Sequence, residues 1–309
     1  MKSNVKQSNR EAAFTIVELL TVMSIIVILI GLLVPALNKV KQYAYDVKQK
    51  AQFHSIDAAI ELFNSEFDGY PDSDALDPDG VPYCGAMKLC EAMMGRDLMG
   101  FHPDSIFRAN GFDSLGNDLY PPQTTGIAYT NSLSARKGPY LPLENANAYQ
   151  LRDIYEQITP FAGSHFVLCD VFRRVTHRQS GQRIGMPILY YKANTANMQH
   201  DVTNPNNPQN IYDYTDNHTL VMLGKPWDPP SKGGEPHRLA IDTGNPSPGY
   251  RFYMNTTNDK VLSTTTAAVR PYRADTYILI SAGSDGEYGT PDDICNFDWK
   301  YREQSQPQN

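Results

Sequence analysis

The chain opens with a short polar leader that is followed by a long apolar run. Residues 14–34, FTIVELLTVMSIIVILIGLLV, are nearly all apolar, and Glu18 is the single acid among them. About 20 residues at ~1.5 Å rise per residue cover the ~30 Å hydrocarbon core of a bilayer. The pattern therefore predicts a transmembrane helix over 14–34. Because an ionised carboxylate inside a membrane is costly, Glu18 is a candidate functional residue.

The helical pattern continues beyond the apolar run, over residues 35–67. Apolar residues recur there at spacings of three and four in two successive stripes: Leu37, Val40, Ala44, Val47 and Ala51, then Phe53, Ile56, Ile60, Phe63 and Phe67. Such spacing predicts an amphipathic helix that packs one face on a globular body. Pro35 removes one backbone hydrogen bond and favours a kink or local melting. The turn residues 68–71, DGYP, end the helix, which would be about 80 Å long in all.

Two later segments read as strands and two as helices. The strand patterns are MPILYY at 186–191 and TYILIS at 276–281, and the second runs into a loop rich in Gly and Asp. Helix-like pieces cover 86–98 and 146–158. Residues 194–249 are dense in Asn, Pro, Asp and Gly, which predicts long surface loops rather than regular elements.

The N-terminus resembles the class III signal of type IV pilins and type II secretion pseudopilins. The resemblance rests on the basic leader 1–13, the small residue Ala13, Phe14, and the apolar helix with its single acid. It implies that a prepilin peptidase cuts between Ala13 and Phe14 and that the new N-terminus is methylated. Most family members carry Gly in place of Ala13. Glu18 would then be the fifth residue of the mature chain.

Glu18 reads as an assembly residue rather than a catalytic one. In a bundle of such helices its carboxylate would lie near the free amine of a neighbour's Phe14, and a buried charge is tolerated when it is paired. The positive leader fits a cytoplasmic N-terminus, with the head outside the inner (cytoplasmic) membrane. An ordinary secretory signal would have a shorter apolar region. The alternative is an uncleaved signal anchor whose Glu18 faces the lipid interface.

The family resemblance also implies the fold class. It is α+β, with a long N-terminal helix packed on a small antiparallel sheet (the type IV pilin fold) and a large insertion. Pro35 and the Tyr-Pro pair after the helix occur at comparable places in the family. The exported head would cover 68–299, with the insertion at 80–180, the C-terminal sheet and loop at 185–299, and a flexible tail at 300–309.

The major pseudopilins end similarly, with a strand and a Gly-Asp-Gly loop that holds calcium. On the residues that match, Asp285 and either Asp292 or Asp293 would supply carboxylates, and backbone carbonyls of 281–290 would complete the six to eight oxygens that calcium takes. The spacing does not fit an EF-hand. The alternative is a surface turn whose aspartates make Asx hydrogen bonds.

Composition narrows the other possibilities. A net charge of −7 and a pI near 5.5 argue against nucleic-acid binding, which needs a concentrated cationic surface. In an oxidising compartment Cys84 and Cys90 could close a short disulfide loop, although buried free thiols remain the alternative for all four cysteines. There is no CxxC pattern for zinc. Catalytic motifs such as HExxH, GxSxG and the P-loop are absent, and His165 and Cys169 read as core residues rather than a dyad.

The sequence therefore favours a structural role over an enzymatic one. The expected protein is processed by a prepilin peptidase and handled by an inner-membrane assembly platform. It would then join copies of itself and other pseudopilins in a filament that serves type II secretion. The first alternative is a minor, competence or adhesion-type pilin. The second, from another class, is a membrane-anchored extracytoplasmic binding or hydrolytic protein.

Overall fold

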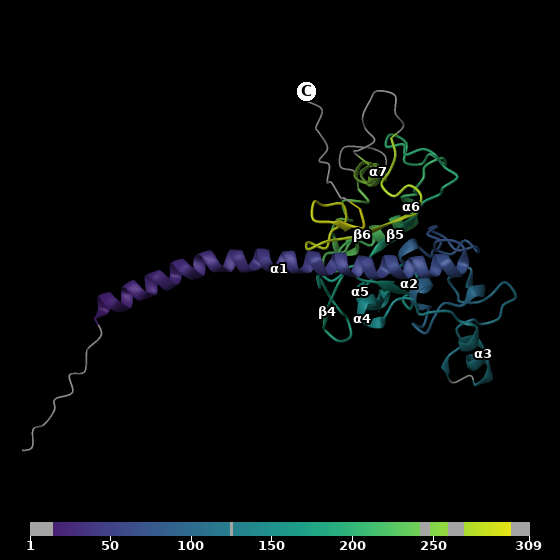
Figure 1. The fold of residues 1–309 in the computed structure, drawn as a ribbon, viewed down its shortest axis with the longest axis horizontal. Coiled ribbons are helices and arrows are strands. Elements are labelled where there is room, and N and C mark those ends of the chain that lie inside the picture. Colours follow the sequence, from purple (N-terminus) through teal and green to yellow (C-terminus); the bar gives the residue numbers. More distant parts are fainter. Residues whose placement is uncertain (1–14, 124–125, 242–247, 259–268, 298–309) are drawn as a thin grey trace, which may run out of the picture. The chain divides into compact units, whose positions relative to one another are not determined.

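The computed structural model describes residues 15–123, 126–241, 248–258 and 269–297, and its architecture is α+β. The chain divides into two units, one ending at Ala44 and the other starting at Tyr45. Helix α1 (Ile16–Phe67) contributes to both. In the second unit, the head, shorter helices and short antiparallel strands join the C-terminal part of α1 (Figure 1).

Helix α1 confirms the long helix that the apolar periodicity predicts. It continues through Pro35 without a break, so the predicted local melting does not occur. A proline in a helix interior removes one backbone hydrogen bond, and the turns on either side keep theirs. The second apolar stripe is also confirmed, because Phe53, Ile56, Ile60 and Phe63 are buried. The first stripe is exposed, so its predicted packing on the head is wrong.

Polar side chains of α1 fix the helix to the head. Gln49 Oε1 accepts a hydrogen bond from the backbone N–H of Val171 at 3.0 Å, and Gln52 Nε2 donates to the carbonyl of Cys169 at 2.9 Å. One turn further along, Asp57 accepts from the Tyr277 hydroxyl at 2.7 Å. Because these partners come from distant parts of the sequence, the hydrogen bonds fix how α1 is rotated about its own axis and how closely it packs against the head.

The two predicted strands pair in a three-stranded antiparallel sheet of order β5-β6-β7. Its strands are β5 (Leu189–Lys192), β6 (Tyr277–Ser281) and β7 (Ile294–Cys295). In the register of β5 and β6, Leu189 lies opposite Ile280. The sheet therefore pairs the predicted strand at 186–191 with the predicted strand at 276–281, about 90 residues later in the chain.

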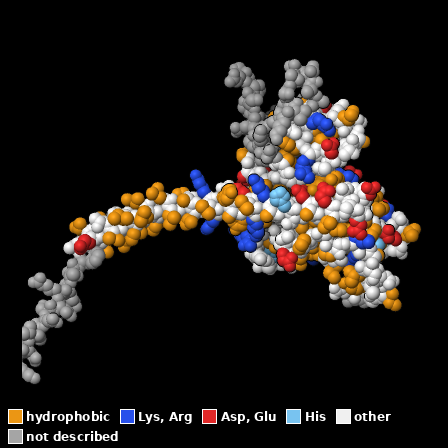
Figure 2. All heavy atoms as spheres, in the orientation of Figure 1, with side chains coloured by type: hydrophobic (Ala, Val, Ile, Leu, Met, Phe, Trp, Pro, Cys, Tyr) orange, Lys and Arg blue, Asp and Glu red, His pale blue; other side chains and the backbone are white. Residues whose placement is uncertain are grey.

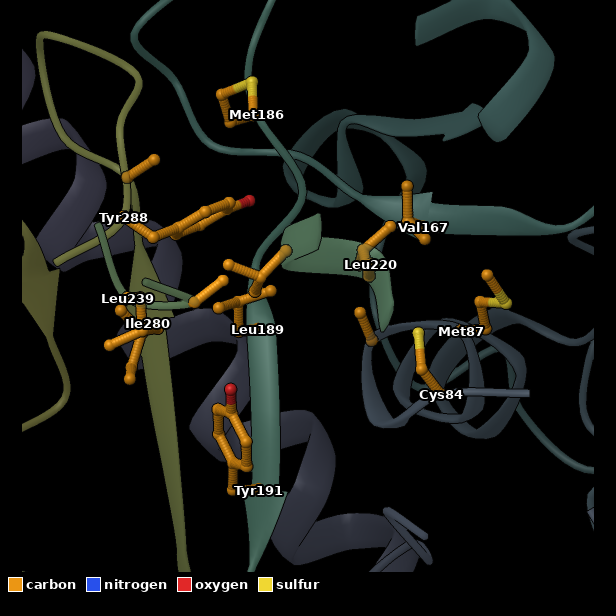
Figure 3. Packing of buried hydrophobic residues seen from close by; sticks show 14 of the residues in the cluster. Cys84, Met87, Val167, Met186, Leu189, Tyr191, Leu220, Leu239, Ile280 and Tyr288 are labelled. Carbon is orange, nitrogen blue, oxygen red and sulfur yellow. The ribbon is translucent and has the colours of Figure 1, made fainter. Parts of the chain in front are cut away.

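Both faces of this sheet are buried, which explains why its strands are apolar at every position. Successive strand residues point to opposite faces. Tyr277 and Leu279 therefore join Ile60 of α1 in one cluster, whereas Ile278 and Ile280 belong to the other. Figure 3 shows this second cluster, in which Leu189 and Ile280 lie near Leu239 and Tyr288.

Helix α2 (Gly85–Met94) places the segment 80–180 in the core of the head. All ten of its residues are buried, and it packs on β2 (Phe166–Leu168) and on β5. The helix is four residues shorter at its C-terminal end than the predicted 86–98, because Gly95 turns the chain with a φ of 80°. Within the segment 80–180, helix α2 and strand β2 therefore belong to the head's core, whereas α3 (Ile127–Ala135) is mostly exposed.

The predicted helix over 146–158 is wrong. The segment instead contains the end of α4 (Leu143–Ala146), strand β1 (Ala148–Gln150) and helix α5 (Leu151–Ile154). Asn147 ends α4 in the left-handed conformation, which Asn tolerates better than most residues and which stops a helix. Strand β1 then pairs with β2 in an antiparallel ladder.

Residues 194–249 are mostly irregular, as predicted, but they contain helix α6 (Thr215–Met222). Asn217 of α6 is fully buried; it accepts a hydrogen bond from the Ala86 N–H at 2.9 Å and donates to the Tyr190 carbonyl at 2.6 Å. The expectation of surface loops alone is therefore wrong here. The other elements are η1 (Pro103–Ser105), α3 (Ile127–Ala135), β3 (Val175–Thr176), β4 (Arg183–Ile184), η3 (Pro230–Lys232) and α7 (Tyr250–Thr256).

The predicted Cys84–Cys90 disulfide is not formed. All four cysteines are buried free thiols. Cys84 caps α2 and Cys90 lies inside it. Six residues along a helix span about 9 Å at 1.5 Å per residue, beyond the ~7 Å that a disulfide bridges between Cα atoms. The two thiols also belong to different core clusters.

Candidate functional site

The apolar end of α1 is the first candidate site. Every side chain over 15–44 is exposed, and hydrophobic side chains follow one another along this stretch in Figure 2. By length and composition, α1 is long and apolar enough to cross a membrane. An exposed apolar surface of this extent marks a region that meets a membrane or another protein.

Glu18 forms a capping box with Thr15 at the start of α1. Its Oε2 accepts hydrogen bonds from the Thr15 backbone N–H at 2.9 Å and from the Thr15 hydroxyl at 2.6 Å. In return the Glu18 N–H donates to Thr15 Oγ1 at 3.2 Å. This is the reciprocal pattern of a Thr-x-x-Glu helix start. The sequence carried that signal, and an interpretation of Glu18 as an assembly residue alone misses it. Ala13 and Phe14 lie outside the described residues.

The loop between β6 and β7 is the second candidate site, and Asp292 is its centre. Asp292 Oδ2 accepts from the Ser284 hydroxyl at 2.8 Å and from the Asp285 N–H at 2.9 Å, and its Oδ1 accepts from the Thr290 hydroxyl at 2.7 Å. Asp285 makes a local Asx hydrogen bond with the Glu287 N–H at 2.8 Å. The loop thus has the Asx turn of the alternative interpretation and also brings Asp285 and Asp292 together.

The two carboxyl groups perturb each other. Burial, and then the negative charge of Asp292, raise the pKa of Asp285 to about 6. Although burial acts in the opposite direction, hydrogen bonds from Thr290, Ser284 and Asp285 hold the pKa of Asp292 below its ordinary value. Burial and the charge of Asp292 also raise the pKa of Asp46 on α1. Negative charge therefore gathers at this loop and at the adjoining face of α1.

The backbone of the loop is built for a close approach at Gly283. A Cβ atom there would lie 2.2 Å from the Asp292 carbonyl oxygen, and the residue has a φ of +64°, which glycine adopts without strain. Asp293 points elsewhere: it is buried, and its Oδ2 accepts from the Gly289 N–H at 2.7 Å. Of the two alternatives for the second carboxylate, Asp292 is the one that lies beside Asp285.

The donor set of this loop suits a hard cation. Two neighbouring carboxylates and two hydroxyls are oxygen groups of the kind that calcium prefers. In the part of the chain that the structure describes, no group of three or more His, Cys, Asp or Glu side chains is arranged to hold a metal. A cation here would therefore depend on hydroxyl and carbonyl oxygens besides Asp285 and Asp292.

Residues far away in the sequence cover the outside of the same loop. A Cβ at Gly286 would lie 2.6 Å from the Trp227 ring, so the ring packs directly on that glycine. Glu287 forms ion pairs with Lys225 at 3.5 Å and with Arg238 at 3.4 Å. Sequence reasoning missed Trp227 and its neighbours because nothing in their local pattern indicates a contact with residues some 60 positions later.

His165 and Cys169 lie in the core, as predicted, and form no catalytic dyad. The imidazole Nε2 is 3.1 Å from the Ala109 carbonyl oxygen and Nδ1 is 3.4 Å from Met87 Sδ. Burial, together with the charge of Arg96, lowers the pKa of His165 to about 4. Burial raises the pKa of the Cys169 thiol well above its ordinary value, which makes it a poor nucleophile.

A large polar cleft in the described head has a volume of about 620 Å³. It is bordered by the loop after α1, the end of β5, the start of α6 and Tyr253. Its charged lining residues are Asp72, Asp74, Lys192, Asp213 and Asp216, and most of the others carry amide or hydroxyl groups. Such a lining suits polar or cationic partners better than apolar ligands.

No family model, curated protein or solved structure matches this chain.

Proposed function

We propose that this chain is a membrane-anchored structural subunit of the type IV pilin-like class, most similar to the major pseudopilins of type II secretion. The observation that carries the proposal is the division of α1 into two surfaces. Its N-terminal part is apolar and exposed on all sides, whereas the face over Phe53–Phe63 is buried in the head. One helix thus serves as the membrane anchor and as the spine of an exported domain.

The same apolar surface would hold subunits together once they leave the membrane. Packing the Ile16–Val34 surfaces of neighbouring subunits against one another keeps that apolar area away from water, at about 25 cal/mol per Å². A head-to-tail association that does not close on itself produces a helical filament. The subunits would then be held together by hydrophobic contacts, and polar groups would set the axial position of each subunit relative to its neighbour.

Glu18 would set that register at the start of the helix. Within one chain its carboxylate is satisfied by Thr15. In a filament the free amine of a neighbour's Phe14 would supply a positively charged partner, and a paired carboxylate is tolerated where an unpaired one is not. The capping box keeps Glu18 hydrogen-bonded until that partner arrives, which lowers the cost of holding a carboxylate in the bilayer.

We further propose that Asp285 and Asp292 hold a calcium ion. When bound, calcium supplies positive charge that offsets the repulsion between the two carboxylates and links the ends of β6 and β7. Asp285 and Asp292 lie side by side in a half-buried loop, where burial, and then the charge of Asp292, raise the pKa of Asp285; a cation would offset the second of these effects. The loop would then be stiffened beside the sheet that anchors α1.

Calcium is expected to raise the melting temperature of the full chain in detergent by about 5–10 °C at 100-fold excess over its Kd. The shift should be smaller at pH 5 than at pH 7.5, because protons compete for Asp285. In a Trp299→Phe background, Trp227 emission reports the loop directly, since its ring packs on Gly286. Asp285→Asn with Asp292→Asn should abolish both responses, and the exposed Asp104→Asn should keep them. Equal melting with calcium and with chelator would refute the site.

The N-terminus decides the proposal as a whole. Intact mass and N-terminal sequence of the membrane-extracted chain should show Phe14, methylated, as the first residue when a prepilin peptidase is coexpressed. Met1 should be retained without the peptidase, and Ala13→Leu should block the cut because the position needs a small residue. A chain that keeps Met1 in the presence of an active peptidase would falsify the pilin-like assignment.

The polar cleft favours the anchored binding protein as the second candidate. Its volume of about 620 Å³ and its carboxylate and amide lining would accept a polar ligand outside the membrane. If the chain retains Met1 and the detergent-solubilised protein binds a polar ligand saturably, the anchored binding protein is favoured over a filament subunit.

A further inference from the structure

A cationic surface lies on the β3–β4 hairpin. Within residues 173–183 the hairpin and its flank carry four arginines: Arg173, Arg174, Arg178 and Arg183. None of them forms a direct ion pair with a carboxylate of the described residues, although Arg178, after the hydrogen bond and charge of Lys232, helps to lower the pKa of the nearby Glu156 carboxyl. In a chain of net charge −7, several exposed guanidinium groups without a direct carboxylate contact indicate a surface that meets an anionic partner.

Three of these arginines line one cleft of about 260 Å³, here called the arginine cleft: Arg174, Arg178 and Arg183. Trp227 forms part of its wall, with the Arg174 guanidinium 5.4 Å from the ring centroid. Arg183 Nη1 donates to the Arg174 carbonyl at 3.0 Å. The lining carboxylate in this cleft, Glu156, is already hydrogen-bonded to Lys232. The cleft therefore presents oriented guanidinium groups, which suit carboxylates better than lysines do.

The large polar cleft has the opposite character. Asp74 and Asp213 are exposed at its rim, and Asp72 and Asp216 lie deeper. Burial, and then the charges of Asp72 and Asp213, raise the pKa of Asp74, so these carboxylates repel one another. Lys88, which pairs with Asp72, and Lys192 offset part of that charge, and the exposed Asp74 and Asp213 have no direct ion pair among the described residues. Each cleft thus holds a like-charge cluster that an oppositely charged surface would stabilise.

We propose that the arginine cleft of one copy receives the Asp74 and Asp213 rim of a second copy. The inference rests on the proposed filament function and names a contact between heads within it. In Figure 1 the β4 hairpin and helix α6, which borders the polar cleft, lie on different sides of the head, so a single copy does not satisfy both clefts itself. The contact is therefore heterologous and extends from copy to copy.

The chemistry favours a second copy of this chain over other anions. The described part of one head carries both the donor and the acceptor surface, which is what a repeating head-to-tail contact requires. Electrostatic pairs at such a rim contribute specificity and register more than affinity. The apolar helices supply the affinity, so a modest contact between heads suffices to choose the rotation of successive subunits.

Charge reversal tests the contact in membranes that contain two differently tagged copies of the full chain. One copy carries Thr176→Cys in the arginine cleft and the other Thr195→Cys in the polar cleft. Oxidation should link the two tags. Arg178→Glu in the first copy, or Asp74→Arg in the second, should lower the linked fraction about tenfold, since like charges then face each other. Combining the two reversals should restore it.

The matched control reverses exposed charges outside both clefts, with Arg152→Glu in the first copy and Asp104→Arg in the second. The linked fraction should then stay unchanged. Filaments of processed subunits that show no linkage, or linkage that ignores both reversals, would overturn the contact while leaving the proposed function intact. Retention of Met1 would count against the function alone.

The anionic partner of the arginine cleft could also be a lipid headgroup, which vesicles containing phosphatidylglycerol test. Vesicle binding that is lost with Arg178→Glu and unaffected by Asp74→Arg, in the absence of linked tags, would assign the arginine cleft to lipid headgroups and overturn the second-copy proposal.

Discussion

Asp72→Ala is expected to destabilise the head by about 3 kcal/mol, because it leaves a buried ammonium group without its carboxylate. Lys88 lies inside α2 and is 1% exposed, and its Nζ donates to Asp72 Oδ2 at 2.6 Å and to the Leu76 carbonyl at 2.9 Å. Removing Asp72 leaves the carbonyl alone to stabilise the charge. The Asp72 side chain is 38% exposed, which keeps the loss at the lower end for such pairs.

Chemical denaturation of the full chain in detergent, followed by tryptophan emission, measures this effect. Combining Lys88→Met with Asp72→Ala should recover most of the lost stability, because no buried charge remains and the methionine fills similar space. Asp104→Ala is the matched control: the side chain is 75% exposed, and the expected change is below about 0.5 kcal/mol. Equal losses for Asp72→Ala and Asp104→Ala would show that the pair contributes nothing.

Those elements of the fold that have strong local periodicity could be predicted from the sequence. Helix α1 and strand β6 follow from runs whose spacing is set by residues next to one another. The complete burial of α2 could not, because its polar residues look like a solvent face. Glu91 is buried because the hydroxyls of Tyr83, Ser105 and Tyr120 donate to it. No local pattern shows that such distant donors will converge on one carboxylate.

The same limit applies to the candidate sites. Asp285 and Asp292 are seven residues apart, so a Gly-rich loop that brings them together could be anticipated. Asp46 approaches the loop from α1, and Trp227 covers it from a segment some 60 residues earlier. These approaches depend on how the sheet and α1 pack. At Cys84 and Cys90 the local sequence is misleading. Their short separation suggests a disulfide, but the helix that Cys84 caps holds the two thiols apart.

Asp170 makes the stability of the head depend on pH. The residue is 2% exposed and holds three segments together: its Oδ1 accepts from the N–H groups of Phe172 and Met186, each at 3.1 Å, and its Oδ2 accepts from the Ser281 hydroxyl at 2.9 Å. Burial raises its pKa from 3.8 to about 7, even though these hydrogen bonds act in the opposite direction. A pKa that is higher in the folded state means that the native chain binds more protons than the unfolded chain between pH 4 and 7. Stability contributed by this group is therefore full below pH 4 and is lost as the pH rises through 7.

Asp170→Asn should remove this dependence, since the amide keeps two acceptor contacts through Oδ1 and donates to Ser281 through Nδ2. The upper bound on the gain at pH 8 is about 4 kcal/mol, from roughly three pKa units at 1.36 kcal/mol each. Denaturation of the full chain at pH 4 and pH 8 should show nearly equal stabilities at the lower pH and a more stable variant at the higher one. The exposed Asp104→Asn should change neither value. A difference between wild type and Asp170→Asn that stays constant from pH 4 to pH 8 would show that Asp170 is ionised throughout this range in the native head, and that its hydrogen bonds outweigh the cost of burial.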